Sequence, residues 1–209
     1  MFAELCITSN FTFLTGASHP EEYMERAALM GVAAIAVADV NSVAGIVRAH
    51  SAGREIARQV EELERLEAEG GTIGPPAPPG LPVPPRAPVR NVPRLIPAVR
   101  LVFTEGVEMV ALAESRAGWG HLCRMLSAGR LRAEKGTCHL YLSDLADDVE
   151  GLQFILLAPD RVAAGWRRHA AALVRVYRSR LPATEEVGDP NFGHEERRPA
   201  RSADDYAQK

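Results

Sequence analysis

Five positions that end apolar runs could bring functional groups together at one edge of a sheet. They are Cys6, Thr8, Asp39, Val40 and Arg100. Ligand sites in α/β proteins lie at the carboxyl ends of strands, which is where these residues are expected. Catalysis by a bound metal needs several imidazole or carboxylate ligands around an open position. Only Asp39 is a hard ligand, because Cys6 has a soft thiol and Val40 has no donor atom. The sequence therefore predicts no competent metal centre at this edge.

Four cations in a short stretch form a second candidate site. They are Arg124, Arg130, Arg132 and Lys135. Such a cluster could contact a phosphate backbone or an acidic partner surface. The alternative, which we favour, is a solvated helix end and loop, since cations also favour the carboxyl end of a helix dipole. No aromatic residue lies among the four, which argues against a platform for stacking single-stranded bases.

The cysteines and histidines do not form a metal-binding pattern. Cys138 with His139, and His121 with Cys123, each lack a second pair at ligand spacing, so structural roles are favoured. The three cysteines include no CxxC pair, which predicts neither a disulfide framework nor a zinc site and fits a reducing cytoplasm.

Composition limits the partners further. The 209 residues are 46% hydrophobic and 24% charged with a formal net charge of −3, as in an ordinary globular protein without a general attraction to nucleic acid or acidic membranes. No apolar run is long enough for a membrane span, and the first ten residues lack the basic start of a signal peptide. We expect a cytoplasmic protein that does not bind membranes.

Strands and helices alternate along the chain. Strands are expected at 4–8, 32–38, 95–103, 107–114, 139–142 and 152–158, and helices at 19–30, 42–50, 54–69, 119–129 and 161–173. Residues 173–177 could finish the last helix or start a strand. Ser18 and Glu21 fit a capping box, and Gly31 and Gly129 are placed to end helices. This alternation predicts an α/β fold, either an open sheet or a barrel.

Two segments do not fit the alternation. Residues 75–88 contain eight prolines, so we expect a surface insertion at about 74–93 rather than helix or central strand. A partner that reads Pro-rich segments is conceivable, but a passive insertion is favoured. Residues 183–209 are highly charged without periodicity and are expected to be disordered. A barrel needs strands up to its end, so we expect an incomplete barrel and a truncated chain.

Four stretches carry a family resemblance. They are SNFTFLTGASHPEE, AIAVADVNSVAGIVRAH, LIPAVRLVF and GWGHLCRMLSAGRLRAEKGTCHLYLSDL. With them, the chain from about Ala3 to Tyr177 resembles the N-terminal PHP (polymerase and histidinol phosphatase) domain of bacterial C-family DNA polymerases. The resemblance is to the error-prone, damage-inducible branch. It implies a distorted (β/α) barrel of PHP type over residues 1–182.

The resemblance also implies that most of the five positions at the strand ends have lost the metal ligands of the family. The family pattern places His-x-His after the first strand, Asp-His after the second and Glu after the third. In this chain those places hold Cys6 and Thr8, Asp39 and Val40, and Arg100. Metal-dependent phosphoester hydrolysis, which such clusters support in active members, should therefore be absent. We hypothesise that the guanidinium of Arg100 pairs with Asp39 in place of metal.

The function that the resemblance implies is DNA synthesis across lesions, in DNA repair and damage-induced mutagenesis. The intact polymerase would use Mg²⁺, but these residues offer no paired catalytic aspartates, so this part is expected to be a metal-free scaffold. Its expected partners are the remaining polymerase domains, DNA through the full-length enzyme, and other mutagenesis proteins. Two alternatives stay open: a PHP-type phosphoesterase with an altered site using Asp39, His50 and residues late in the chain, and a truncated interaction module.

Overall fold

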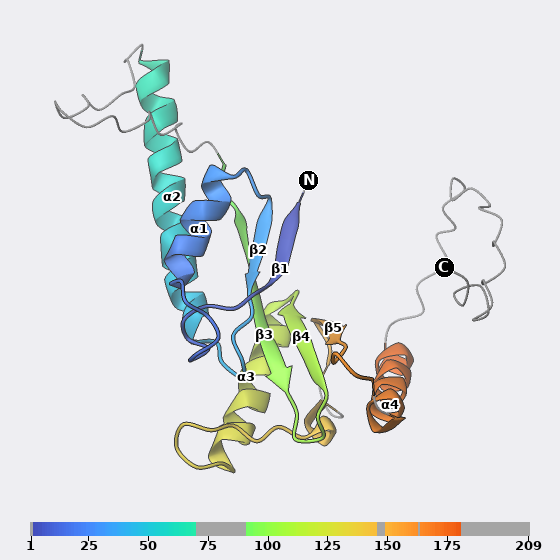
Figure 1. The fold of residues 1–209 in the computed structure, drawn as a ribbon. Helices are drawn as coiled ribbons and strands as arrows, with labels where there is room; N and C mark the ends of the chain where they lie inside the picture. Colours follow the sequence, from blue (N-terminus) through green and yellow to red (C-terminus); the bar gives the residue numbers. More distant parts are fainter. Residues whose placement is uncertain (1, 70–90, 146–148, 163, 181–209) are drawn as a thin grey trace, which may run out of the picture.

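The computed structural model describes residues 2–69, 91–145, 149–162 and 164–180. Most of the predicted Pro-rich insertion at 74–93 and all of the predicted tail at 183–209 lie outside these residues. The described part contains one sheet and its covering helices (Figure 1).

Five strands form a single mixed sheet. They are β1 (Ala3–Ile7), β2 (Ala34–Val37), β3 (Arg94–Val102), β4 (Glu108–Ala113) and β5 (Leu152–Leu157), and they lie in the order β1-β2-β3-β4-β5. The first three strands are parallel, whereas β4 is antiparallel to both β3 and β5. The carboxyl ends of β1, β2 and β3 therefore meet at one edge, as the candidate site requires.

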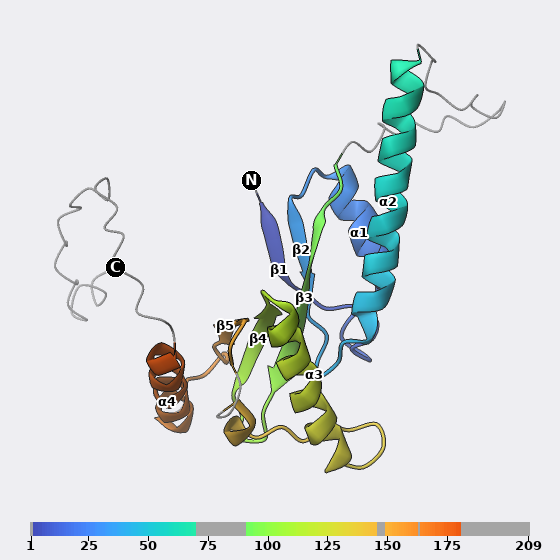
Figure 2. The same cartoon turned by 180° about the vertical axis from the view of Figure 1, so that it is seen from behind.

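The helices lie beside different parts of this sheet. They are α1 (Pro20–Leu29), α2 (Ala44–Ala68), α3 (Arg116–Leu131) and α4 (Ala164–Arg180), and a 3-10 turn spans Leu142–Leu145. α1 and α2 run side by side next to β1–β3, and α2 extends beyond the sheet (Figures 1 and 2). α3 lies against β3 and β4, and α4 lies beyond β5 (Figure 2).

Side-chain alternation along the strands separates the cores on the two faces of the sheet. Ile35 and Val37 of β2 pack with Met24 of α1 and with the inner face of α2. Leu101 of β3 belongs to a second core with Leu122 of α3. The opposite face carries small buried side chains, Ala36, Ala38, Ala98 and Val110, flanked by half-buried Leu5, Ile96, Leu112, Ile155 and Leu157.

The structure confirms the predicted α/β class. Its five-stranded sheet agrees with an incomplete barrel, because within the described residues β1 and β5 each pair on one side only. The predicted strands at 4–8, 32–38, 95–103, 107–114 and 152–158 are all present, with ends shifted by a few residues at most. The strand predicted at 139–142 is reduced to one bridge between Phe103 and Leu140. Residues 173–177 are helical.

Three local predictions are wrong. The helices predicted at 42–50 and 54–69 are one continuous helix, because Ser51–Gly53 keep helical geometry against α1.

Gly129 does not end α3. The helix continues to Leu131, and Gly129 is buried where an added Cβ would lie 2.6 Å from a methyl carbon of Leu140. The capping interaction of α1 lies one residue later than predicted, since the Glu22 carboxylate accepts from the His19 N–H at 2.8 Å. Gly31 follows α1 with φ of +68°, as a helix-ending glycine should.

Candidate site at the carboxyl ends of the parallel strands

Asp39 follows β2 and is almost completely buried, with 1% of its surface exposed. Its carboxylate accepts three hydrogen bonds from the loop that follows β1. Ser9 donates its main-chain N–H and its hydroxyl, each at 2.8 Å, and Thr12 donates its hydroxyl at 2.9 Å. A buried carboxylate needs such donors, because an ionised group without partners is very costly to bury. Asp39 is therefore a structural centre that joins the ends of β1 and β2.

The loop and α2 close around this carboxylate. The Thr12 hydroxyl also accepts a hydrogen bond from the Val40 N–H at 3.0 Å, so one side chain bridges two consecutive residues of the β2 end. On the other side stands Gly45, in the first turn of α2. A Cβ added there would lie 2.6 Å from Oδ2 of Asp39 and 3.1 Å from Oγ of Ser9. The backbone of α2 therefore fits beside the carboxylate only because position 45 has no side chain.

Arg100, near the end of β3, pairs with Glu108 of β4. Its Nε and Nη2 atoms donate to the same carboxylate oxygen of Glu108 at 2.9 and 2.5 Å. The two side chains retain 31% and 37% of their exposure, so the pair is partly solvated. Arg100 lies opposite Val110 in the β3–β4 ladder, which places Arg100 and Glu108 on the same face of the sheet.

The predicted ion pair between Arg100 and Asp39 is wrong. These residues do touch, but through the main chain: the Arg100 N–H donates to the Asp39 carbonyl at 3.1 Å, as part of a short parallel bridge between Val40 and Arg100. The guanidinium is turned to Glu108, while the carboxylate of Asp39 is turned to the β1 loop. The hydroxyls of Ser9 and Thr12 satisfy Asp39 without a second buried charge.

The other positions of this edge supply no further ligand set. Cys6 is classed as exposed. The partial burial of its thiol still raises the pKa of that thiol; the positive charge of Arg100 acts against this rise, and the negative charge of Glu4 adds to it. Thr8 is half-buried, and its carbonyl accepts from the Tyr23 hydroxyl at 3.2 Å. Among the described residues, no group of three or more His, Cys, Asp or Glu side chains is placed to hold a metal ion. The donor chemistry of this edge does not fit the metal cluster of the family pattern.

Asn41 connects this edge to β3 and α3. It has a left-handed φ of +46°, which Asn tolerates better than most residues. Its side-chain amide pairs with the main chain of Val102, accepting from the N–H at 3.0 Å and donating to the carbonyl at 3.2 Å. Its own carbonyl accepts from Arg130 at 3.0 Å. Neither Asn41 nor Ser42 caps α2, whose N-cap residue is Val43; the Ser42 hydroxyl accepts from the Ala44 N–H at 3.2 Å in a local turn at the helix start.

Two of the four cations of the second candidate site serve the fold. Arg130 reaches Asn41, as above. Arg132 forms two hydrogen bonds with Asp144, at 2.6 and 3.0 Å, and its guanidinium lies 5.3 Å from the ring centre of Tyr141. Arg124 and Lys135 are exposed. Arg130 and Arg132 thus make contacts within the fold, and contact of the four cations with phosphate or a partner stays a prediction.

The residues that sequence reasoning missed are the partners of the predicted ones. Glu108 could have been found, because the strands at 95–103 and 107–114 with a short turn between them form a hairpin whose register brings it near Arg100. Ser9 and Thr12 had no such signal, since hydroxyl residues are common in loops. Only the expectation that a buried Asp39 needs donors points to them.

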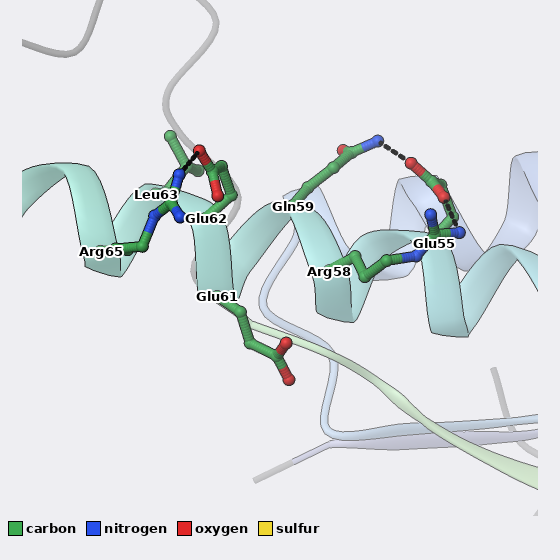
Figure 3. A pocket seen from close by; sticks show the side chains of 7 residues that line it. All are labelled: Glu55, Arg58, Gln59, Glu61, Glu62, Leu63 and Arg65. Carbon is green, nitrogen blue, oxygen red and sulfur yellow. Dashed lines mark hydrogen bonds and ion pairs between the residues drawn. The ribbon is translucent and has the colours of Figure 1, made fainter.

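A surface hollow lies elsewhere, along the exposed side of α2 (Figure 3). It is lined by Glu55, Arg58, Gln59, Glu61, Glu62, Leu63 and Arg65. Its charges pair along the helix: Arg58 with Glu55 at 2.5 Å, and Arg65 with Glu62 at 2.7 Å. These pairs are typical of a solvated helix and do not converge on a ligand. Within the described part, no helix combines the length and the apolar character that crossing a membrane requires.

Comparison with known proteins identifies the family. No protein-family model matches the chain. An error-prone DNA polymerase from Ruegeria pomeroyi is 44% identical over 169 residues, which cover 77% of this chain and 15% of that protein. One from Rhodopseudomonas palustris (strain BisB5) is 37% identical over 176 residues, covering 84% of this chain and 13% of that protein. The chain is homologous to part of the error-prone DNA polymerases. One from Rhodopirellula baltica is 32% identical over 169 residues, covering 81% and 12%.

Two solved structures share a weaker likeness with this error-prone polymerase homologue. A metal-dependent phosphoesterase from Bifidobacterium adolescentis gives a TM-score of 0.38 at 18% identity, covering 63% of this chain and 35% of that one. An amidohydrolase from Chromobacterium violaceum gives a TM-score of 0.39 at 18% identity, covering 63% and 34%. The family assignment rests on the sequence relatives and not on these structures.

Proposed function

We propose that this chain is the N-terminal PHP part of an error-prone DNA polymerase and serves it as a metal-free scaffold. The main support for the proposal is that the Asp39 carboxylate accepts hydrogen bonds from Ser9 and Thr12. The nearby Arg100 adds a positive charge that is itself held by Glu108. The one carboxylate of the family pattern that this chain keeps here holds the sheet edge together.

The scaffold role follows from what these contacts connect. Asp39 joins the ends of β1 and β2, Asn41 joins β2 to β3, and Arg130 joins that junction to α3. Such a network fixes the loops at this edge relative to one another without any ion. A fixed set of loops on a packed sheet is suited to positioning a neighbouring domain.

The proposal extends to the activity of the whole enzyme. The polymerase to which the part belongs would act in translesion synthesis and DNA repair in the cytoplasm, with Mg²⁺ used by its catalytic domains. This part would meet DNA only through the full-length enzyme. Its partners would be the remaining polymerase domains and, in the mutagenic response, other proteins. The share of the relatives that this chain matches, 15% and 13%, supports domains outside it as partners.

The phosphoesterase alternative gains no support from the site. It would need Asp39 and His50 as ligands, but the Asp39 carboxylate already accepts three protein hydrogen bonds, and His50 is exposed on α2. A hydrolytic metal centre would have to break the contacts that join β1 to β2.

A chimeric polymerase tests the scaffold role. Residues 1–182 of this chain replace the matched segment of the Ruegeria pomeroyi enzyme, and primer extension on damaged and undamaged templates is measured. We expect extension close to that of the parent, and we expect an Arg100→Met change in the chimera to leave it unaffected. A chimera that folds but does not extend primers would contradict the proposal.

A further inference from the structure

The loop between β1 and α1 presents large apolar side chains to solvent. Phe13 is 84% exposed and Leu14 is 90% exposed. We call these two residues the loop tip. The loop that carries them follows β1 at the edge where the parallel strands end, and its Ser9 lies close to Gly45 at the start of α2 (Figure 1). Adjacent apolar residues exposed to this degree are unusual on a soluble surface and mark interaction sites.

The loop is held firmly although its tip is exposed. Thr12 donates its N–H to the Ser9 carbonyl at 2.9 Å, and its own carbonyl accepts from Thr15 and Gly16, each at 3.1 Å. The base is closed by Asn10, whose N–H donates to the Ser18 carbonyl at 2.9 Å. Asp39 then ties Ser9 and Thr12 to the buried sheet edge. The tip is therefore presented in a fixed conformation, which lowers the entropic cost of binding.

The backbone at the tip is strained, and the side chain that adopts the strained conformation stays exposed. Leu14 has a φ of +62°, in the left-handed region that favours Gly and Asn. A glycine would adopt this turn without strain, and a leucine gains nothing there from burial within this chain. Strained conformations of this kind concentrate at binding and functional sites.

The chemistry of the tip favours a protein partner. Phe13 could stack on a base, but Leu14 has no π face. At the same end of the sheet, Arg130 is occupied by the carbonyl of Asn41 and Arg132 by Asp144, so these cations are committed within the fold. An apolar pocket on a protein is the surface that complements a phenylalanine next to a leucine.

We propose that the loop tip inserts into an apolar pocket on the polymerase part of the full-length protein. This rests on the proposed function. The length of the relatives argues for that occupant, because the matched segment is 15% of the Ruegeria pomeroyi enzyme and the rest of that chain is tethered to it. Asp39 is then a positioning residue for docking, because it fixes the loop that carries the tip.

Cysteine labelling tests the proposal in two proteins, the 209-residue chain and the chimera described above. Leu14→Cys is the probe, and Met30→Cys is the control, because Met30 is 65% exposed and lies between α1 and the amino end of β2, at the opposite edge of the sheet. Maleimide labelling is read for each cysteine peptide by mass spectrometry, which separates the probe from the native Cys6, Cys123 and Cys138. We expect the Leu14→Cys thiol to react about tenfold more slowly, or slower still, in the chimera than in the free chain, with Met30→Cys little changed.

A second measurement does not depend on thiol chemistry. A protease site is inserted after residue 182 of the chimera, and the two parts are separated by size after cleavage. With the native tip or with a Met30→Ser control, the parts should elute together; with Phe13→Ser and Leu14→Ser combined, they should separate. The two serine changes remove little packing within the chain, because Phe13 is 84% and Leu14 90% exposed.

Each other outcome overturns the tip proposal in a different way. Equal labelling of Leu14→Cys in both proteins, in a chimera that extends primers, rejects the tip and leaves the scaffold proposal standing. Equal protection of both cysteines indicates general coverage and also rejects it. Protection that appears only after primer–template is added assigns the tip to nucleic acid. A chimera that does not extend primers rejects the scaffold proposal, and the tip proposal with it.

Discussion

Ser9 donates both its main-chain N–H and its hydroxyl to the carboxylate of Asp39, one to each oxygen, at 2.8 Å. This double contact links the residue that follows the first strand region to the residue that follows the second. It occupies the edge of the sheet where related proteins of the PHP pattern are expected to gather metal ligands. The same carboxylate also holds Thr12, so one buried charge organises a complete loop.

Replacing Asp39 with Asn should destabilise the protein. The amide keeps the size of the side chain but brings a donor to a place where Ser9 and Thr12 already donate, so at least one buried polar group loses its partner. We expect the free energy of unfolding to fall by about 2 kcal/mol or more. Urea unfolding followed by circular dichroism measures it. Asp160→Asn, at an exposed position, should change stability by less than about 0.5 kcal/mol; equal effects of the two changes would contradict the structural role of Asp39.

Gly45→Ala tests how closely α2 approaches that carboxylate. Alanine normally stabilises a helix relative to glycine by about 1 kcal/mol. Here the new methyl group would lie 2.6 Å from Oδ2 of Asp39 and 3.1 Å from Cγ of Pro20, so we expect a net loss of about 1–3 kcal/mol. Thermal unfolding provides the comparison with Gly165→Ala, where nothing lies within 4 Å of the added Cβ. A stabilising Gly45→Ala change would show that the helix does not crowd Asp39.

The pairing of Arg100 can be measured with double-mutant cycles. Arg100→Met combined with Glu108→Gln should show a coupling of about 0.5 kcal/mol, small because both side chains are about one-third exposed. Arg100→Met combined with Asp39→Asn should show a smaller coupling than the Glu108 cycle. A larger coupling to Asp39 would restore the ion pair that the sequence suggested and the structure rejects.

The contact between Arg132 and Asp144 should make stability depend on pH in acid. Burial raises the pKa of Asp144, but the hydrogen bonds from Arg132 and the Tyr141 N–H and the charge of Arg132 together lower it below its ordinary 3.8. The folded state then binds fewer protons than the unfolded state. The stabilisation is complete above that ordinary value and is lost as pH falls through the lowered pKa. Unfolding free energies of the wild type between about pH 2 and 6 should therefore fall more steeply in acid than those of Asp144→Asn. Parallel curves would contradict the lowered pKa.

The strands and helices could be predicted from the sequence more accurately than the contacts between them. Apolar runs such as those around Ile35 and Val99 identify buried strands because continuous burial needs continuous apolar sequence. The sequence analysis predicted two helices in place of α2, because Ser51 and Gly53 resemble a helix break. In the structure the helix is continuous there, and Gly53 lies close to Met24 of α1. Gly129 looked like a helix end for the same reason, but close contact with Leu140 explains it.

The sequence analysis placed the five candidate residues at the strand ends, but it predicted the wrong partner for Arg100. The positions of Cys6, Asp39 and Arg100 at one edge follow from the parallel strand order, which the sequence predicts. Which charge meets which partner depends on the direction of each side chain at the strand ends. Arg100 turns to the neighbouring antiparallel strand, a relationship that only the register of the hairpin fixes.

The most direct measurement is the metal content of the purified 209-residue chain after exposure to Mn²⁺ and Zn²⁺, read by elemental analysis and by calorimetric titration. The matched variant restores the family pattern with Cys6→His, Thr8→His, Val40→His and Arg100→Glu. We expect the native chain to retain metal well below one ion per molecule and the restored variant to gain affinity. A native chain that binds stoichiometric metal at this edge and hydrolyses a phosphoester until a chelator is added would contradict it.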